Sequence, residues 1–360
     1  MLQVIKQWYQ QYFSDPQAII LAIVLLACFA ILMLFGDILA PIIAAAVLIY
    51  ILEGLVQRLE KLKVPRILAV TVVLLLFIAC CLVAIFGIIP MLTRQLTRFL
   101  AELPELLAKG QNYLSLLPDR YPAIFSESEI QSLFDGIRHE LLSLGQGIVS
   151  FSLANAVSVL TVLVYIVLVP ILVFFGLKDK TLILNWLGRF LPDRRELTRQ
   201  VWHDVDVRIG SYIRGKIIEI LIIWFVCYLS FAWWGLNYAM LLSFLVGLSV
   251  IIPYVGAVVV TVPIAIVAAV QWGIGAEFGF VMGTYAVIQI LDGNVLVPIL
   301  FSEVVNLHPV AIIVAITFFG GLWGVWGVFF AIPLATLVDT VIRAWPALQA
   351  EAEAPSPNTS

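Results

Sequence analysis

Long apolar runs separated by polar links dominate this chain. A helix that crosses a bilayer needs about 20 consecutive, mostly apolar residues. Runs of about this length recur along the chain, and each predicts one membrane-crossing helix. Six helices of this kind are predicted, at 18–36, 39–57, 66–90, 150–176, 217–235 and 274–291.

Two further apolar runs, 240–270 and 308–342, break in the middle at proline and glycine. As one straight helix the second run would be about 50 Å long, which exceeds a hydrocarbon core of about 30 Å. We therefore expect both runs to fold back as re-entrant helical hairpins, although two ordinary helices joined by a very short turn are the alternative. The expected hairpin tips are Pro253, Gly256, Gly320, Gly321, Gly324 and Gly327.

The placement of basic residues predicts the orientation of the chain. Lysines and arginines concentrate in the link 58–66 and in the segment 177–216, which the positive-inside rule assigns to the cytoplasm. Both termini are then cytoplasmic, and the segment 91–149 lies outside. The two hairpins would open on opposite faces with their tips near the midplane, as an inverted pair that suits alternating access.

Five regions follow from this orientation. The predicted fold is all-α, a polytopic integral membrane protein with about six spanning helices and two opposed re-entrant hairpins. Its regions are scaffold helices over 1–90, an extracytoplasmic amphipathic helical segment over 91–149, the fourth helix with a basic cytoplasmic hairpin over 150–216, a transport core over 217–345, and a disordered polar tail over 346–360.

Composition agrees with a membrane protein and argues against an enzyme. Hydrophobic residues make up 62% of the chain and charged residues 12%, whereas soluble domains are about half apolar and about a quarter charged. The four cysteines lie in apolar runs without the spacing of a metal or redox site. Hydrolase and nucleotide-binding motifs are absent, so we expect no catalytic residues, no metal, no cofactor and no nucleic-acid partner.

Asp292 is the foremost candidate for a functional side chain. Polar groups within apolar runs are costly and are therefore functional candidates. Gln289 lies three residues before Asp292 on the same helical face, and Asn294 follows it closely. This carboxylate, the two amides and freed backbone carbonyls could together coordinate a cation or a polar solute. The alternative is a helix end at the inner interface where Asp292 is simply solvated.

Three other side chains are candidates for ion coupling. Glu219 lies one turn into its predicted helix near Lys216, which indicates either an interfacial ion pair or a proton relay. Asn306 and His308 flank the start of the second hairpin. His308 could titrate near neutral pH, although a capping or loop histidine is the alternative.

Short motifs along nearly the whole chain resemble the AI-2E family of membrane transporters. They include Phe174-Phe175-Gly176-Leu177-Lys178-Asp179, Tyr212-Ile213-Arg214-Gly215, Ile252-Pro253-Tyr254-Val255-Gly256 with Pro263, the stretch 289–298, Leu307-His308-Pro309, and Gly324-Val325-Trp326-Gly327 to Ala331-Ile332-Pro333-Leu334. Each motif is short, but their order and spacing together are specific. One departure is Glu53, in Tyr50-Ile51-Leu52-Glu53-Gly54, where the family often has a proline after Tyr-x-Leu.

The resemblance implies a multi-pass exporter or antiporter of the inner (plasma) membrane. Its members have been linked to export of the autoinducer-2 signalling molecule and to exchange of sodium or lithium for protons, so the implied partners are the lipid bilayer and a small polar solute or monovalent cation. The resemblance also implies a homo-oligomer, with a pentamer as one expected assembly. A passive oligomeric pore and a non-transporting scaffold that binds a partner through 91–149 are the rival interpretations.

Overall fold

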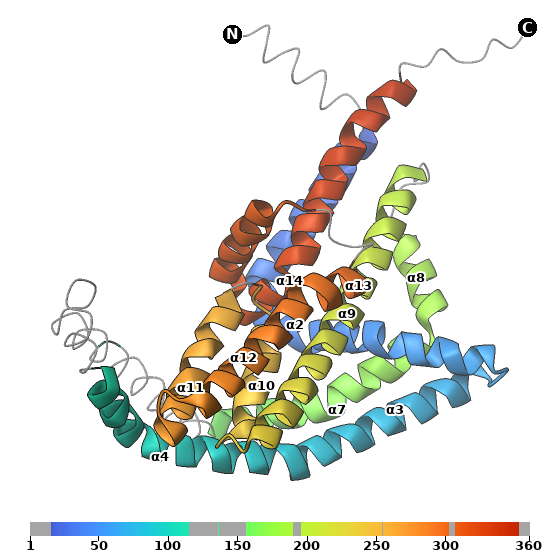
Figure 1. Ribbon diagram of the computed structural model, residues 1–360. Coiled ribbons are helices and arrows are strands. Elements are labelled where there is room, and N and C mark those ends of the chain that lie inside the picture. The colour runs from blue at the N-terminus through green and yellow to red at the C-terminus, as the bar shows by residue number, and fades with distance from the viewer. Residues whose placement is uncertain are drawn as a thin grey trace, which may run out of the picture. The chain divides into compact units, whose positions relative to one another are not determined.

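The computed structural model of the chain is helical throughout its described part (Figure 1). It describes residues 16–114, 136, 156–189, 196–253, 255–301 and 307–352. No strand occurs in these ranges. The predicted all-α fold class is therefore confirmed.

Among the described residues, six helices are long and apolar enough to cross a membrane. Four of them correspond to the spans predicted at 39–57, 66–90, 217–235 and 274–291, whereas the other two lie in the broken runs 240–270 and 308–342. The helix expected at 66–90 reaches residue 105, and the one expected at 274–291 reaches residue 301. The expected helix near 150–176 has a shorter apolar part, Val164–Lys178, among the residues searched. The six candidate spans are Ile38–Lys61, Arg66–Glu105, Asp206–Trp234, Val255–Trp272, Ala276–Phe301 and Pro309–Thr340.

Several helices continue past the limits that hydropathy predicts. The helix α2 (Pro16–Lys61) joins the first two predicted spans and departs from helical geometry at Phe35, with φ −123° and ψ 16°. The segments α3 (Arg66–Val83), η1 (Ala84–Ile88) and α4 (Ile89–Leu114) follow one another without a loop. The expected outer segment therefore begins as an extension of a membrane helix, and most of its remainder lies outside the described residues.

The helix α9 (Glu196–Trp234) shows the largest difference from the expected limits, because it begins well before residue 217. The segment 177–216 is predicted to be a basic helical hairpin, and most of its described part is helical. It includes the end of α7 (Ala156–Lys178), α8 (Lys180–Gly188) and the first half of α9.

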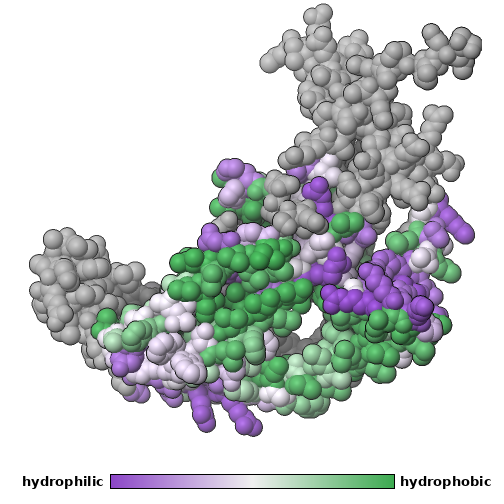
Figure 2. Space-filling model, turned by 45° about the vertical axis from the view of Figure 1, so that its right-hand side comes forward, coloured by the Kyte–Doolittle hydropathy of each residue, from purple (hydrophilic) through white to green (hydrophobic). Residues whose placement is uncertain are grey.

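Large apolar side chains remain exposed on many helices, and Figure 2 shows them covering much of the visible face. Phe86 is 76% exposed, and Trp233 is 86% exposed. Soluble proteins rarely expose large contiguous apolar surfaces. These side chains therefore suit contact with lipid.

The chain divides into two compact units. Unit 1 comprises Met1–Leu74, Val167–Gly215 and Phe301–Ser360, and unit 2 comprises Leu75–Ile166 and Lys216–Leu300. In unit 2, α10 (Ala239–Ser249) and α11 (Val255–Trp272) pack on each other and on α4, and α12 (Ala276–Leu291) packs on α11. In unit 1, α14 (Pro309–Ala352) contacts α2.

The first broken run folds back between α10 and α11, close to the predicted tip. Gly256, the second residue of α11, lies against the end of α10. A Cβ placed at Gly256 would be 1.8 Å from the carbonyl oxygen of Ser249. Only glycine permits this close backbone approach.

The second broken run folds back at Gly324 within α14. Gly324 has φ 58° and ψ −132°, a conformation that side-chain-bearing residues rarely adopt. A Cβ placed at Gly327 would be 1.8 Å from the carbonyl oxygen of Phe319, whereas eight residues of straight helix span about 12 Å. The two limbs of α14 therefore double back, as Figure 1 shows. The second limb continues to Ala352, into the segment expected to be disordered.

Candidate functional site

A buried ion pair lies in the middle of α9, at the start of unit 2. The Nζ of Lys216 is 2.6 Å from Oε2 of Glu219, and the residues are 4% and 2% exposed. Both residues are at least about 15 Å along the helix from either end of the candidate span Asp206–Trp234. The pair therefore lies far from the start of the helix. A helix that begins at 217, as predicted, would instead place this pair at the membrane interface.

Lys216 also binds the broken segment of the same unit. Its Nζ donates a hydrogen bond of 3.0 Å to the carbonyl oxygen of Val250. Val250 caps the C-terminus of α10, where the last carbonyls of a helix have no intrahelical partner. The break between α10 and α11 is thus connected directly to the ion pair, as non-helical backbone within a membrane requires.

Asp292 provides a second buried carboxylate in unit 2. It is 8% exposed and caps the C-terminus of α12, where the π-helical turn η2 (Asp292–Leu296) begins. Its charge acts on Lys216 and on Glu219. The structure therefore brings together two of the predicted coupling residues, Glu219 and Asp292, around one lysine.

Three buried polar atoms here have no hydrogen-bond partner among the described residues. They are Oδ1 of Asp292, Nε2 of Gln289 and Oε2 of Glu219, the last of which is ion-paired with Lys216. Buried polar atoms without partners are rare and call for an explanation such as a functional role or a bound ion. A π-helical turn within an α-helix is also frequent at functional sites.

The unit 2 cluster of Lys216, Glu219 and Asp292 is not electrically neutral if all three side chains are ionised. Lys216 contributes one positive charge, while Glu219 and Asp292 contribute two negative charges. Within the described ranges, no group of three or more histidine, cysteine, aspartate or glutamate side chains forms a potential metal site. A proton or one monovalent cation would complete the charge balance.

The other predicted coupling residues lie elsewhere. Asn294 is exposed, and its Nδ2 donates to the carbonyl oxygen of Ile290 at 2.8 Å. His308 belongs to unit 1, where its exposed ring accepts a hydrogen bond of 3.2 Å from the backbone N–H of Val310. This contact matches the capping alternative for His308. Asn306 lies outside the described residues.

The predicted tip residues divide between the two units. Pro253 lies in the turn before α11 and Gly256 in its first turn, both in unit 2. Unit 1 holds the four glycines of α14. Of these, Gly324 forms the reversal, and the limbs on either side of it hold Gly320, Gly321 and Gly327.

Two contributors to the cluster and its surroundings were not predicted. The Val250 carbonyl has no sequence signal, because every residue carries one. Tyr285 lies two turns before Asp292 on α12, and its hydroxyl donates to the carbonyl oxygen of Ala257 at 3.0 Å. Spacing of seven residues places Tyr285 and Asp292 on one helical face, which could have identified it.

Comparison with known proteins identifies the family. A family model described as AI-2E family transporter matches residues 19–347. "Putative permease PerM" of Escherichia coli (strain K12) is 46% identical over 346 residues, which cover 96% of this chain and 98% of that protein. "Putative transport protein YueF" of Bacillus subtilis (strain 168) is 27% identical over 303 residues, which cover 83% and 81%. These names describe transporters and not enzymes. The chain therefore belongs to the AI-2E transporter family.

Proposed function

We propose that this multi-pass membrane protein is a secondary transporter that moves a small polar solute or a monovalent cation by alternating access. Movement would be coupled to a proton or cation held by Lys216, Glu219 and Asp292. The observation that carries this proposal is the excess carboxylate in this buried cluster of unit 2. Sodium or lithium exchanged for protons is the form of coupling that this chemistry suits best.

The argument for coupling is electrostatic. An unpaired charge in a low-dielectric environment is strongly unfavourable, and intramembrane carboxylates commonly mark ion pathways or proton relays. The excess carboxylate can be neutralised by a proton or by a sodium-sized cation. Because either species could supply the missing positive charge, binding of one would favour release of the other.

The broken helix supports a link between this cluster and conformational change. Lys216 bonds both Glu219 and the Val250 carbonyl at the end of α10. A cation or proton that alters the Lys216–Glu219 pair would therefore alter the support of the break between α10 and α11. Interrupted helices near the midplane are typical of transporter binding sites. The reversal between α10 and α11 and the reversal at Gly324 would each act as a re-entrant hairpin in this scheme.

The basic links favour one placement in the cell. Lysines and arginines in 58–66 and 177–216 support a position in the inner (plasma) membrane with both termini cytoplasmic. A homo-oligomer is compatible with this orientation, and a pentamer is the assembly to be tested first.

A flux experiment tests the proposal. Purified protein in sealed liposomes would receive sodium or lithium on one side while internal pH is recorded. The native chain should show a cation-dependent pH change that Asp292→Asn abolishes. The matched control is Asp179→Asn, which removes a carboxylate that is 34% exposed and pairs with Lys178 at 3.6 Å.

Each other outcome has a definite meaning. Equal pH responses in the native chain and Asp292→Asn would overturn coupling through Asp292. An unsaturable downhill flux that is insensitive to Asp292→Asn would identify a passive pore instead. If neither cation changes the internal pH, sodium or lithium exchange is excluded. The transporter assignment would then require saturable, proton-driven movement of a polar solute such as autoinducer-2.

A further inference from the structure

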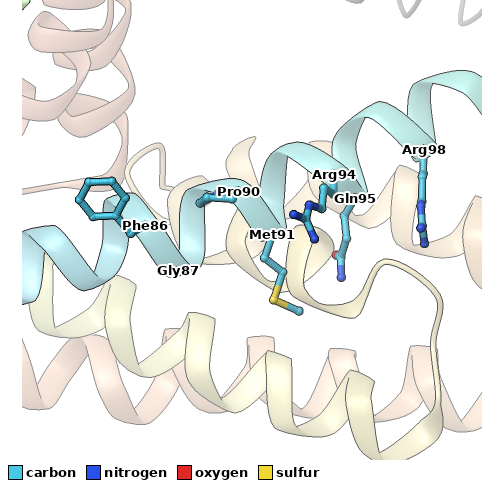
Figure 3. Close-up of a pocket in the computed structure, with 7 residues that line it drawn as sticks. All are labelled: Phe86, Gly87, Pro90, Met91, Arg94, Gln95 and Arg98. Carbon is cyan, nitrogen blue, oxygen red and sulfur yellow. The ribbon is translucent and has the colours of Figure 1, made fainter.

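A cationic groove follows the exposed face of η1 and α4 in unit 2, and none of its lining residues belongs to the proposed coupling site. Its cavity has a volume of about 400 Å³. Phe86 and Met91 contribute apolar surface, while Arg94, Gln95 and Arg98 contribute polar groups (Figure 3). Residues three and four positions apart lie on the same helical face, so these side chains form one stripe.

The two arginines give this groove a positive charge. Arg94 and Arg98 are exposed, and neither forms an ion pair with a described residue. The nearby carboxylate of Glu102 accepts a hydrogen bond from the hydroxyl of Tyr238. Burial and this carboxylate raise the pKa of Tyr238 to about 12, so the phenol stays protonated and continues to donate. The Glu102 carboxylate is therefore held by Tyr238.

The remaining polar residue of the groove is fixed by a helix end. Oε1 of Gln95 accepts a hydrogen bond of 2.9 Å from the backbone N–H of Leu241, in the first turn of α10. This bond satisfies one of the free N–H groups at a helix N-terminus. It leaves the Nε2 of Gln95 as a further donor for an anion beside Arg94.

An apolar groove adjoins the cationic one through Met91, which lines both. It has a volume of about 550 Å³, and its other lining residues include Leu221, Trp224, Phe225 and Met240. The two grooves together therefore offer an anion site and a long apolar surface.

We propose that these joined grooves bind one membrane phospholipid with an anionic headgroup. The phosphate contacts Arg94 and Arg98, because guanidinium groups recognise phosphate strongly. An acyl chain lies along Met91 in the apolar groove.

The position of the stripe favours a lipid over a soluble anion. Arg94 and Arg98 lie in the last turns of the candidate span Arg66–Glu105, where long basic side chains reach the headgroup layer. A free phosphate ion could use the arginines, but it would leave the apolar groove empty. An amphiphile uses both features.

Native mass spectrometry of the purified full chain provides the test. Retention of phosphatidylglycerol would be compared with that of phosphatidylcholine carrying the same acyl chains. The native chain should prefer the anionic lipid. The double variant Arg94→Gln/Arg98→Gln should lower the affinity for phosphatidylglycerol roughly 25-fold, because each basic residue near anionic lipid contributes about fivefold. The affinity for phosphatidylcholine should change little.

A matched control removes two other exposed cations, with Lys61→Gln/Lys63→Gln. This variant should retain the preference for the anionic lipid. Equal binding of the two lipids by the native chain, or equal losses in both double variants, would overturn the proposal. A third arm adds inorganic phosphate. Displacement of phosphatidylglycerol by millimolar phosphate would identify free phosphate as the ligand and would also overturn it, whereas retention supports a lipid.

Discussion

Units 1 and 2 each bury a carboxylate among charged residues, but they balance its charge differently. In unit 1, Glu53 is 3.4 Å from both Arg66 and Lys180, and Gln57 donates to it at 3.2 Å. Arg66 also pairs with Glu60 at 3.1 Å, so two cations balance two carboxylates in this cluster. In unit 2, Lys216 alone faces two carboxylates, one of which has an oxygen without a partner in the described part of the chain.

The difference indicates different roles. Arg66 also donates to the carbonyl oxygen of Leu177, near the C-terminus of α7, with Nη2 at 2.6 Å. The Glu53 cluster thus connects α2, α3, α7 and α8 through satisfied contacts, as a structural joint does. The unit 2 cluster is left with a charge deficit, which suits a site that takes up and releases a cation or proton.

The largest effect on stability is expected when Lys216, the cation that faces Glu219 and Asp292 in unit 2, is removed. Lys216→Met leaves two buried carboxylates without a counter-charge and frees the Val250 carbonyl, so it should reduce stability by about 3–5 kcal/mol. Lys180→Met removes one of two cations around Glu53, and Lys180 is 31% exposed. That control should lose about 1 kcal/mol or less. Thermal unfolding in detergent measures both, and equal losses would remove the distinction between the clusters.

The next effect concerns the reversal that presents the Val250 carbonyl to Lys216. Gly256→Ala places a methyl group 1.8 Å from the Ser249 carbonyl oxygen, and the backbone must shift to relieve this clash. We expect a loss of about 1–3 kcal/mol together with impaired transport. Gly279→Ala is the matched control on α12, because no atom lies within 4 Å of its added Cβ. A thermally unchanged Gly256→Ala protein would contradict the close approach of α10 and α11.

A smaller effect on stability is expected when either buried acid, Glu53 or Asp292, is neutralised. Glu53→Gln weakens the contacts to Arg66 and Lys180 and should cost about 1–2 kcal/mol. Asp292→Asn removes a carboxylate whose Oδ1 has no partner in the described ranges, so it should preserve or increase thermal stability while abolishing coupled transport. If Asp292→Asn is the more destabilising of the two, Asp292 is primarily structural.

The smallest effect on stability is expected from Tyr285, which tests whether this side chain supports the unit 2 cluster. Tyr285→Phe removes the hydrogen bond from α12 to the Ala257 carbonyl and should cost about 1 kcal/mol. Tyr165→Phe is a suitable control, because its half-buried hydroxyl makes no hydrogen bond to the described residues. If both variants unfold at the native temperature, Tyr285 does not support the cluster measurably.

The breaks in the fold could be predicted because proline and glycine carry local signals. Gly256 and Gly324 mark the two reversals, since close backbone approach and positive φ require glycine. The buried acids could also be predicted, because Glu219 and Asp292 are polar within apolar runs. These features depend on residue type alone.

Features that depend on tertiary packing could not be predicted in the same way. Hydropathy places a helix start at 217 because Arg214 and Lys216 are basic, yet α9 passes through them. Burial of Lys216 depends on Glu219 and on a backbone carbonyl far along the chain. The π-helical turn after Asp292 also changes the helical register, and Asn294 is exposed while Asp292 is buried.

Proton release on cation binding tests the central claim most directly. Sodium or lithium would be added to purified protein in a weakly buffered detergent solution near neutral pH, and the released protons would be counted. The account predicts about one proton released per chain, since a cation replaces the proton at the excess carboxylate, and no release from Asp292→Asn. Saturable cation binding without proton release, or equal release from Asp292→Asn, would contradict it.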